Sequence, residues 1–93
     1  MLDINEYQKA VTKVKKYKIE QEDLYLLAKL TEETGEVAKE IRRKVDGEPM
    51  EKDLTKELGD LLWCISAIAK SNNIKLSTII EQNLVKLEER KLL

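Results

Sequence analysis

Apolar residues recur at helical spacing along almost the whole chain, and the 93 residues include only three glycines and one proline. A repeat of three to four residues places apolar side chains on one side of an α-helix. The pattern predicts an all-α fold in one domain, 1–93, with helices over about residues 4–17, 22–45, 51–71 and 78–90. Because the connections are short, we expect a four-helix antiparallel bundle, formed within the chain or completed by homo-oligomerisation.

Local signals support these helix ends. Asp3 followed by Glu6 has the spacing of a capping box for the first helix, and Thr78 followed by Glu81 has the same spacing at the start of the fourth. Residues 46–49 read Asp-Gly-Glu-Pro, which is typical of a turn that ends a helix and reverses the chain.

The apolar stripes predict which faces of the second and third helices point inward. For the second helix the stripe is Leu24, Leu27, Leu30, Thr31, Thr34, Ala38, Ile41 and Val45. For the third it is Leu54, Leu58, Leu61, Leu62, Ile65, Ile68 and Ala69. Gly35 lies at the edge of the first stripe. A glycine inside a helix costs roughly 1 kcal/mol relative to alanine, so we expect another backbone to approach closely there.

Composition narrows the function classes. With 17 basic and 18 acidic residues, the charge balance gives no reason to expect a general binder of nucleic acid polymers or membrane surfaces. The longest apolar run, 61–69, is too short to span a bilayer. The single cysteine, Cys64, favours a reducing compartment, and we expect the cytoplasm. The chain has no histidine, so oxygen atoms must hold any bound metal.

Five acids in two short clusters are the main candidate chemistry, Glu-Glu-x-x-Glu at 32–36 and Glu-x-x-Asp at 57–60. Residues three apart lie on the same side of a helix. Glu57 also falls at the margin of the apolar stripe, where an unpaired carboxylate would cost several kcal/mol. A proton, a basic side chain or a cation could neutralise it, and the second acid one turn on favours a cation.

Two such helices side by side would bring four carboxylates together, and Mg²⁺, or alternatively Mn²⁺, is the natural ion between them. These candidate ligands are Glu33, Glu36, Glu57 and Asp60. The alternative is an ordinary solvated face, in which Glu33 pairs with Lys29 and Glu36 pairs with Lys39.

The fourth helix has the opposite character. Asn83 falls on its apolar side, with Lys86 and Arg90 just beside it. An inward amide flanked by two cations suits an anion, although Asn83 could instead cap a neighbouring helix end while the two bases pair with surface acids such as Glu89. Four acids together with this triplet fit a nucleotide phosphate chain bridged by Mg²⁺.

Three segments together resemble the MazG-like nucleotide pyrophosphohydrolases: Glu-Glu-Thr-Gly-Glu-Val at 32–37, Glu-Leu-Gly-Asp at 57–60, and Asn-x-x-Lys-x-x-x-Arg at 83–90. The resemblance covers about Leu24 to Arg90. It implies an all-α enzyme that uses Mg²⁺ to hydrolyse the α–β phosphate bond of a nucleoside triphosphate, which yields the monophosphate and pyrophosphate. It also implies a homodimer or homotetramer.

Carried over by position, the resemblance implies metal ligation by Glu33, Glu36, Glu57 and Asp60, and substrate contacts from Asn83, Lys86 and Arg90. Glu32 becomes an accessory acid that orients water. Because no histidine is available, Glu32 and Glu33 are our candidates for the carboxylate that accepts the proton of the attacking water. The natural substrate would be a standard (d)NTP or a non-canonical one removed as housekeeping.

The sequence also allows two rival interpretations. One is a non-enzymatic helical module that forms homo-oligomers or regulates a partner, and its acids would then be a solvated surface. The other is a ferritin-like di-iron bundle, which is disfavoured because its Glu-x-x-His ligands require histidine.

Overall fold

The structure is a computed structural model that describes residues 3–13 and 17–93. Its α-helices are α1 (Ile4–Val11), α2 (Glu22–Val45), α3 (Leu54–Ser71) and α4 (Leu76–Glu89), and a short 3₁₀ helix, η1 (Ile19–Gln21), precedes α2. The described ranges contain no β-strand, so the predicted all-α class is confirmed. The bounds predicted for α2 are also confirmed, whereas α3 begins three residues later than predicted. The predicted end of the first helix was wrong: α1 stops at Val11, and positions 14–16 lie outside the described residues.

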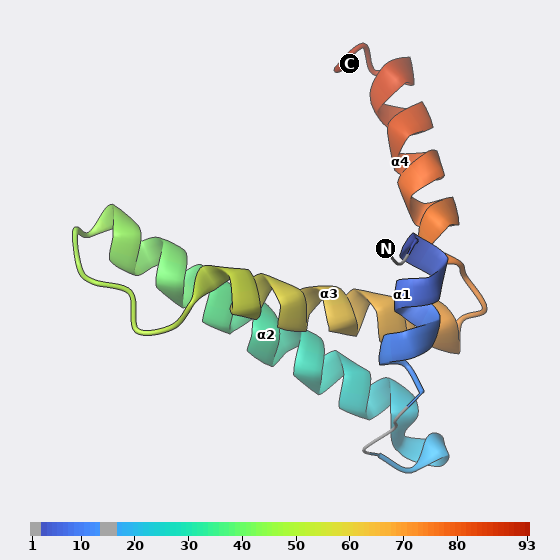
Figure 1. The fold of residues 1–93 in the computed structure, drawn as a ribbon, viewed down its shortest axis with the longest axis horizontal. Coiled ribbons are helices and arrows are strands. Elements are labelled where there is room, and N and C mark those ends of the chain that lie inside the picture. The colour runs from blue at the N-terminus through green and yellow to red at the C-terminus, as the bar shows by residue number, and fades with distance from the viewer. Residues whose placement is uncertain (1–2, 14–16) are drawn as a thin grey trace.

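A helical hairpin forms the centre of the molecule (Figure 1). In it α2 and α3 lie side by side and antiparallel, joined by a loop in which Gly47 adopts a left-handed φ of 74°. A side chain at Gly47 would be strained in that conformation, which explains the glycine at the predicted turn. Helix α1 packs against the end of α3, and α4 packs against α1 and extends away from the hairpin. Completion of a bundle by a second copy stays a prediction.

The side of α2 that faces α3 is not the predicted one. The buried residues of α2 are Leu26, Glu33, Val37 and Glu40. In contrast, the predicted inward residues Leu24 and Val45 are 71% and 78% exposed. At about 100° per residue, the two faces lie roughly a third of a turn apart around the helix. The apolar stripe of α2 is therefore open to solvent in the single chain.

Helix α3 follows its prediction in part. Ala69 is buried and Leu61 is half-buried, whereas Leu58, Leu62 and Ile65 are exposed. The close backbone approach expected at Gly35 was also wrong. A Cβ atom built there would meet nothing within 4 Å in the described structure.

The two predicted capping boxes differ in outcome. The Asp3 side chain accepts a hydrogen bond from the backbone N–H of Glu6, so the cap of α1 is confirmed. Helix α4 begins at Leu76, before the predicted start, and its N-cap residue Lys75 provides no side-chain hydrogen bond. The box predicted at Thr78 was therefore wrong.

Candidate metal centre

Three acidic side chains converge on the seam between α2 and α3. Glu33 comes from the middle of α2, and Glu57 and Asp60 come from successive turns at the start of α3. One carboxylate oxygen of each lies within 4.8 Å of the others, and both glutamates are only 8% exposed. The antiparallel hairpin thus joins one member of the first acidic cluster to both members of the second.

The charges in this trio are poorly compensated. Glu33 pairs with Lys29 at 3.5 Å, but the same ammonium also lies 3.6 Å from Glu32. Within the described residues, no hydrogen bond or ion pair reaches the side chain of Glu57. The Glu57 carboxylate oxygens are not among the fully buried side-chain atoms that lack a partner, so they keep some contact with solvent. Three carboxylates this close nevertheless repel one another unless a proton or a cation neutralises them.

The Lys52 ammonium acts on Glu57 and Glu33 through its charge, but it makes its hydrogen bond with Glu36. The trio therefore depends on two ammonium groups, Lys29 and Lys52, and each of them also pairs with an acid outside the trio.

The donor set fits a hard divalent cation. Mg²⁺ binds oxygen at about 2.1 Å, so the oxygens around it lie roughly 3.0–4.2 Å apart. Because Glu33, Glu57 and Asp60 already have oxygens within 4.8 Å of one another, small side-chain rotations would satisfy that geometry. Two buried ligands and one exposed ligand would leave the solvent side open for water or phosphate oxygens.

Glu36 is not part of this trio. Its carboxylate accepts a hydrogen bond from Lys52 Nζ at 2.8 Å, and this contact lowers the pKa of Glu36 and raises that of Lys52. The pairing of Glu36 with Lys39 considered from the sequence was wrong, because Lys39 instead lies 3.5 Å from Glu51. Glu36 is one helical turn from Glu33, so its use as a ligand requires it to leave Lys52.

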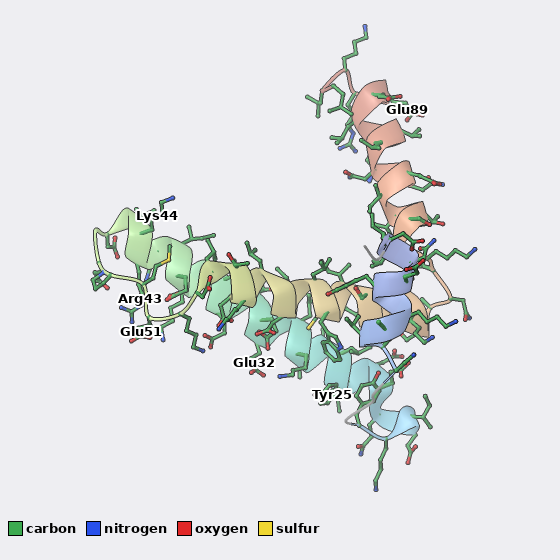
Figure 2. All side chains as sticks on the ribbon, in the orientation of Figure 1. Tyr25, Glu32, Arg43, Lys44, Glu51 and Glu89 are labelled. Carbon is green, nitrogen blue, oxygen red and sulfur yellow. The ribbon has the colours of Figure 1, made fainter. Side chains whose placement is uncertain are left out.

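The loop that carries Lys52 is held by an acid that sequence reasoning missed. Glu40 is 2% exposed, and its carboxylate accepts backbone N–H bonds from Glu51 at 2.9 Å and from Lys52 at 3.1 Å. Arg43 adds a contact of 3.0 Å to Glu51, and Figure 2 labels both residues near the loop. A signal was available, because Glu40 lies seven residues, or two helical turns, after Glu33 and therefore shares its face.

Cys64 lies one turn after Asp60 and is fully buried. Burial raises the pKa of its thiol, and the negative charge of Glu33 raises it further. Both effects favour the neutral thiol, which is a poor nucleophile.

The candidate substrate residues are not brought to the trio within this chain. Asn83, Lys86 and Arg90 are all exposed on α4 or at its end. Figure 2 shows Glu89, next to Arg90, at the free end of α4, whereas Glu32 marks the level of the trio on α2. A complete site made of acids and bases therefore does not form in the single chain.

The sequence of the chain matches the model of a known protein family over most of its length. The family is the MazG nucleotide pyrophosphohydrolase domain, and the match covers residues 21–92. The chain belongs to this family. The match includes α2, α3 and α4 and leaves α1 outside, and the trio lies on the two helices that carry the acidic motifs of the family resemblance.

A curated relative of this MazG-family chain is the Gene 37 protein of Mycobacterium phage L5, which is 38% identical over 73 residues. The alignment covers 72% of the chain and 64% of the phage protein, so the chain spans less than two thirds of that relative's length. No solved structure matches the chain. None of the described helices combines the length and hydropathy needed to cross a membrane. Family membership suggests nucleotide pyrophosphohydrolase activity.

Proposed function

We propose that this protein is a Mg²⁺-dependent pyrophosphohydrolase that converts a (d)NTP to its monophosphate and pyrophosphate. The observation that carries the proposal is the convergence of Glu33, Glu57 and Asp60 in a MazG-family chain, with Glu57 buried and with no hydrogen bond or ion pair to its side chain among the described residues. Its proposed place of action is the cytoplasm. Non-canonical nucleotides are included among the proposed substrates.

The proposed metal ligands are the trio and Glu36, which would exchange Lys52 for the ion. A bound Mg²⁺ would offset the charge of the phosphate oxygens and acidify a water molecule. The chain's own part is to hold the four carboxylates on two packed helices, which fixes their spacing before substrate arrives. The Lys52 ammonium, once freed from Glu36, remains on the loop held by Glu40 and is available to a phosphate oxygen.

Glu32 and Glu33 are the proposed acceptors of the water proton. Glu32 is exposed, and Lys29 lies between the two carboxylates at 3.6 and 3.5 Å. The Lys29 ammonium can pair with either carboxylate. When one of the two acids takes up a proton, Lys29 can therefore balance the negative charge of the other. Glu33 combines ligation with proton acceptance only if it binds the ion through one oxygen, which favours Glu32 as the acceptor.

A second copy of the chain is the proposed source of the bases. Asn83, Lys86 and Arg90 would then contact the phosphates held by the trio of the partner copy. Support comes from the extension of α4 away from its own hairpin and from an apolar groove between α1, α3 and α4. This groove is lined by Ile4, Tyr7, Leu62, Ile65, Ile79 and Ile80. We propose a homodimer, or a homotetramer built from such dimers.

The direct test is pyrophosphate release from a panel of standard and modified (d)NTPs, with and without Mg²⁺. Glu57→Gln keeps the shape of the side chain and removes its charge. We expect this variant to lose about a hundredfold or more of kcat/KM, since a metal ligand contributes several kcal/mol to the transition state. Glu20→Gln, an exposed acid on η1, is the matched control and should keep full activity. Equal activity of the two variants would contradict the proposed site.

Complementation tests the contribution of the second copy. Glu57→Gln and the double variant Lys86→Ala/Arg90→Ala should each be inactive alone. In a refolded equal mixture, half of the dimers contain one chain of each kind, and one of their two sites is intact. The mixture should therefore regain about a quarter of wild-type activity. If it stays inactive while mixed dimers form, the bases do not act across the subunit boundary.

The exposed apolar stripes also favour one alternative, a non-enzymatic helical module. That function would give stable oligomers with neither pyrophosphate release nor a thermal shift in Mg²⁺. The two experiments above distinguish it from the enzyme, because it has no reason to depend on Glu57.

A further inference from the structure

Helix α4 begins without a cap of its own. The first N–H groups of a helix have no partner inside the helix, and a side chain at the N-cap position commonly accepts from them. Lys75 occupies that position with extended backbone dihedral angles, and it provides no such acceptor. The N–H groups of Leu76 and Ser77 nevertheless have partners, and both partners come from α1.

Two amide side chains of α1 supply the missing cap. Gln8 Oε1 accepts from the Leu76 N–H at 3.1 Å, and Asn5 Oδ1 accepts from the Ser77 N–H at 3.3 Å. Asn5 Nδ2 also donates to the Ser77 hydroxyl at 3.0 Å. Asn5 and Gln8 are one helical turn apart, so one side of α1 presents both acceptors to the start of α4.

Gln8 also joins the two helices to α3. Its Nε2 donates to the carbonyl of Ile74 at 2.9 Å, in the turn before α4, and to that of Ser66 on α3 at 3.3 Å. The side chain is 7% exposed, so these bonds are shielded from water. Farther along α1, Trp63 Nε1 donates to the Val11 carbonyl at 2.9 Å, which ties the end of α1 to α3.

We propose that α1 is a clasp that sets the direction of α4, with Asn5 and Gln8 as positioning residues for the substrate-binding side chains of that helix. The catalytic consequence rests on the proposed function, because it assumes that Asn83, Lys86 and Arg90 bind phosphate. The structural part of the proposal, that α1 sets the direction of α4, does not rest on the proposed function. Since α4 extends away from the hairpin, α1 is its main packing partner within the described chain, and loss of the two amides frees α4 to change direction.

The experiment compares a clasp-free variant with one that carries a local cap. Asn5→Ala/Gln8→Leu removes both acceptors and keeps a side chain of similar volume at the buried position. Adding Lys75→Asp gives α4 a good N-cap residue of its own. If the amides serve only to stabilise the start of the helix, the local cap will replace them completely. If the two amides set the direction of α4, the local cap will restore the helix content of α4 but not its direction.

Energy transfer reports the direction without any nucleotide. Trp63 is the only tryptophan and serves as donor, and the acceptor is a dansyl group on Glu89→Cys in a Cys64→Ala background. Labelled chains are mixed with excess unlabelled Trp63→Phe chains, so that transfer occurs within one chain. We expect the clasp-free variant to have a shifted and wider distribution of distances, and Lys75→Asp to leave that distribution unchanged while restoring helix content in circular dichroism.

Kinetics gives the second readout. The clasp-free variant should lose about tenfold in kcat/KM, mainly through KM, with no recovery on addition of Lys75→Asp. Asn5→Asp keeps an acceptor for Ser77 and should retain wild-type values, as should Lys9→Ala, an exposed change on α1. Asn5→Ala alone is a milder variant of an exposed residue and should move the distances in the same direction.

Two results would overturn the clasp: wild-type distances in the clasp-free variant, or restoration of those distances by Lys75→Asp. Failure of the proposed function would have a different signature. Pyrophosphate release would be absent from every variant, including wild type, while the energy-transfer results still decided the role of α1.

Discussion

In the α2–α3 hairpin, acidic side chains are buried between the two helices and apolar side chains are exposed on the outside. The seam between the helices holds the buried acids Glu33, Glu40 and Glu57, whereas the apolar stripes include Leu27, at 62% exposed, and Leu62, at 44%. A monomer stabilised only by its own packing would place these residues the other way round. This arrangement fits the two proposed additions to the single chain, a cation at the seam and a second copy over the exposed apolar residues.

The buried acids are themselves of two kinds. Glu40 has its negative charge satisfied by two backbone N–H groups of the loop between α2 and α3. Glu57 has no such partner among the described residues, and it faces two other acids. Burial alone therefore does not distinguish a structural carboxylate from a candidate ligand. The presence of internal hydrogen-bond donors distinguishes the two kinds of acid.

The largest effect is expected outside the seam. Leu62→Glu places a charge in the apolar groove that we propose a second copy covers. A buried, unpaired charge costs several kcal/mol, so the subunit dissociation constant should rise by about a hundredfold or more. Light scattering over a dilution series measures this change. Lys44→Glu, an exposed change near the turn, should leave the mass unaltered (Figure 2). A wild-type protein that is monomeric at high concentration would refute the proposed cover.

Next in size is Glu40→Ala, which removes the acceptor that holds the loop. A hydrogen bond to a charged acceptor contributes about 1.5–3 kcal/mol, but the two loop amides can bind water once Glu40 is removed, so the pair together contributes less than twice the smaller value. We expect a loss of about 2 kcal/mol, which for a chain of this length lowers Tm by roughly 10 °C. Thermal unfolding in EDTA measures it. An unchanged Tm would mean that the loop is held mainly by Arg43 and Lys39.

Glu57→Gln should shift stability in the opposite direction. Without metal, neutralising this acid relieves repulsion in the trio, and we expect a gain of about 1 kcal/mol, or roughly 5 °C in Tm. Wild-type protein should instead gain about 1.4 kcal/mol when Mg²⁺ reaches ten times its dissociation constant, and the variant should gain much less. Differential scanning calorimetry in EDTA and in Mg²⁺ gives both values. A lower Tm of the variant in EDTA would place Glu57 with Glu40 as a structural acid.

The sequence predicted the helical class, the hairpin turn and the three acids of the trio, because these depend on local spacing and on one antiparallel pairing. It did not predict which face of α2 would be buried. Periodicity reveals an apolar stripe but not what covers it, and the stripe that includes Leu24 and Ile41 is exposed in the chain by itself.

The spacing of residues in the sequence also did not predict the long-range hydrogen bonds. Thr78 and Glu81 have the spacing of a capping box, yet the start of α4 is capped by Asn5, which is 72 residues from Ser77. Lys52 likewise pairs with Glu36 across 16 residues instead of at helical spacing. Such contacts depend on how helices are placed relative to one another, which no local spacing encodes.

The smallest expected effect concerns the pair that keeps Glu36 out of the trio. The pKa of Glu36 is lowered from 4.5 by its contact with Lys52, so the folded state binds this proton less readily than the unfolded state does. The resulting stability is present above about pH 4.5 and is lost as the pH falls through the folded-state pKa. Lys52→Met should therefore lower Tm slightly at pH 7 in EDTA, and the difference from wild type should shrink as the pH falls below about 4.5. Addition of Mg²⁺ sharpens the test, because the ion and Lys52 compete for Glu36 in the proposed site. Isothermal titration should then show tighter Mg²⁺ binding by Lys52→Met than by wild type, and weaker binding would mean that Lys52 assists the ion instead of competing with it.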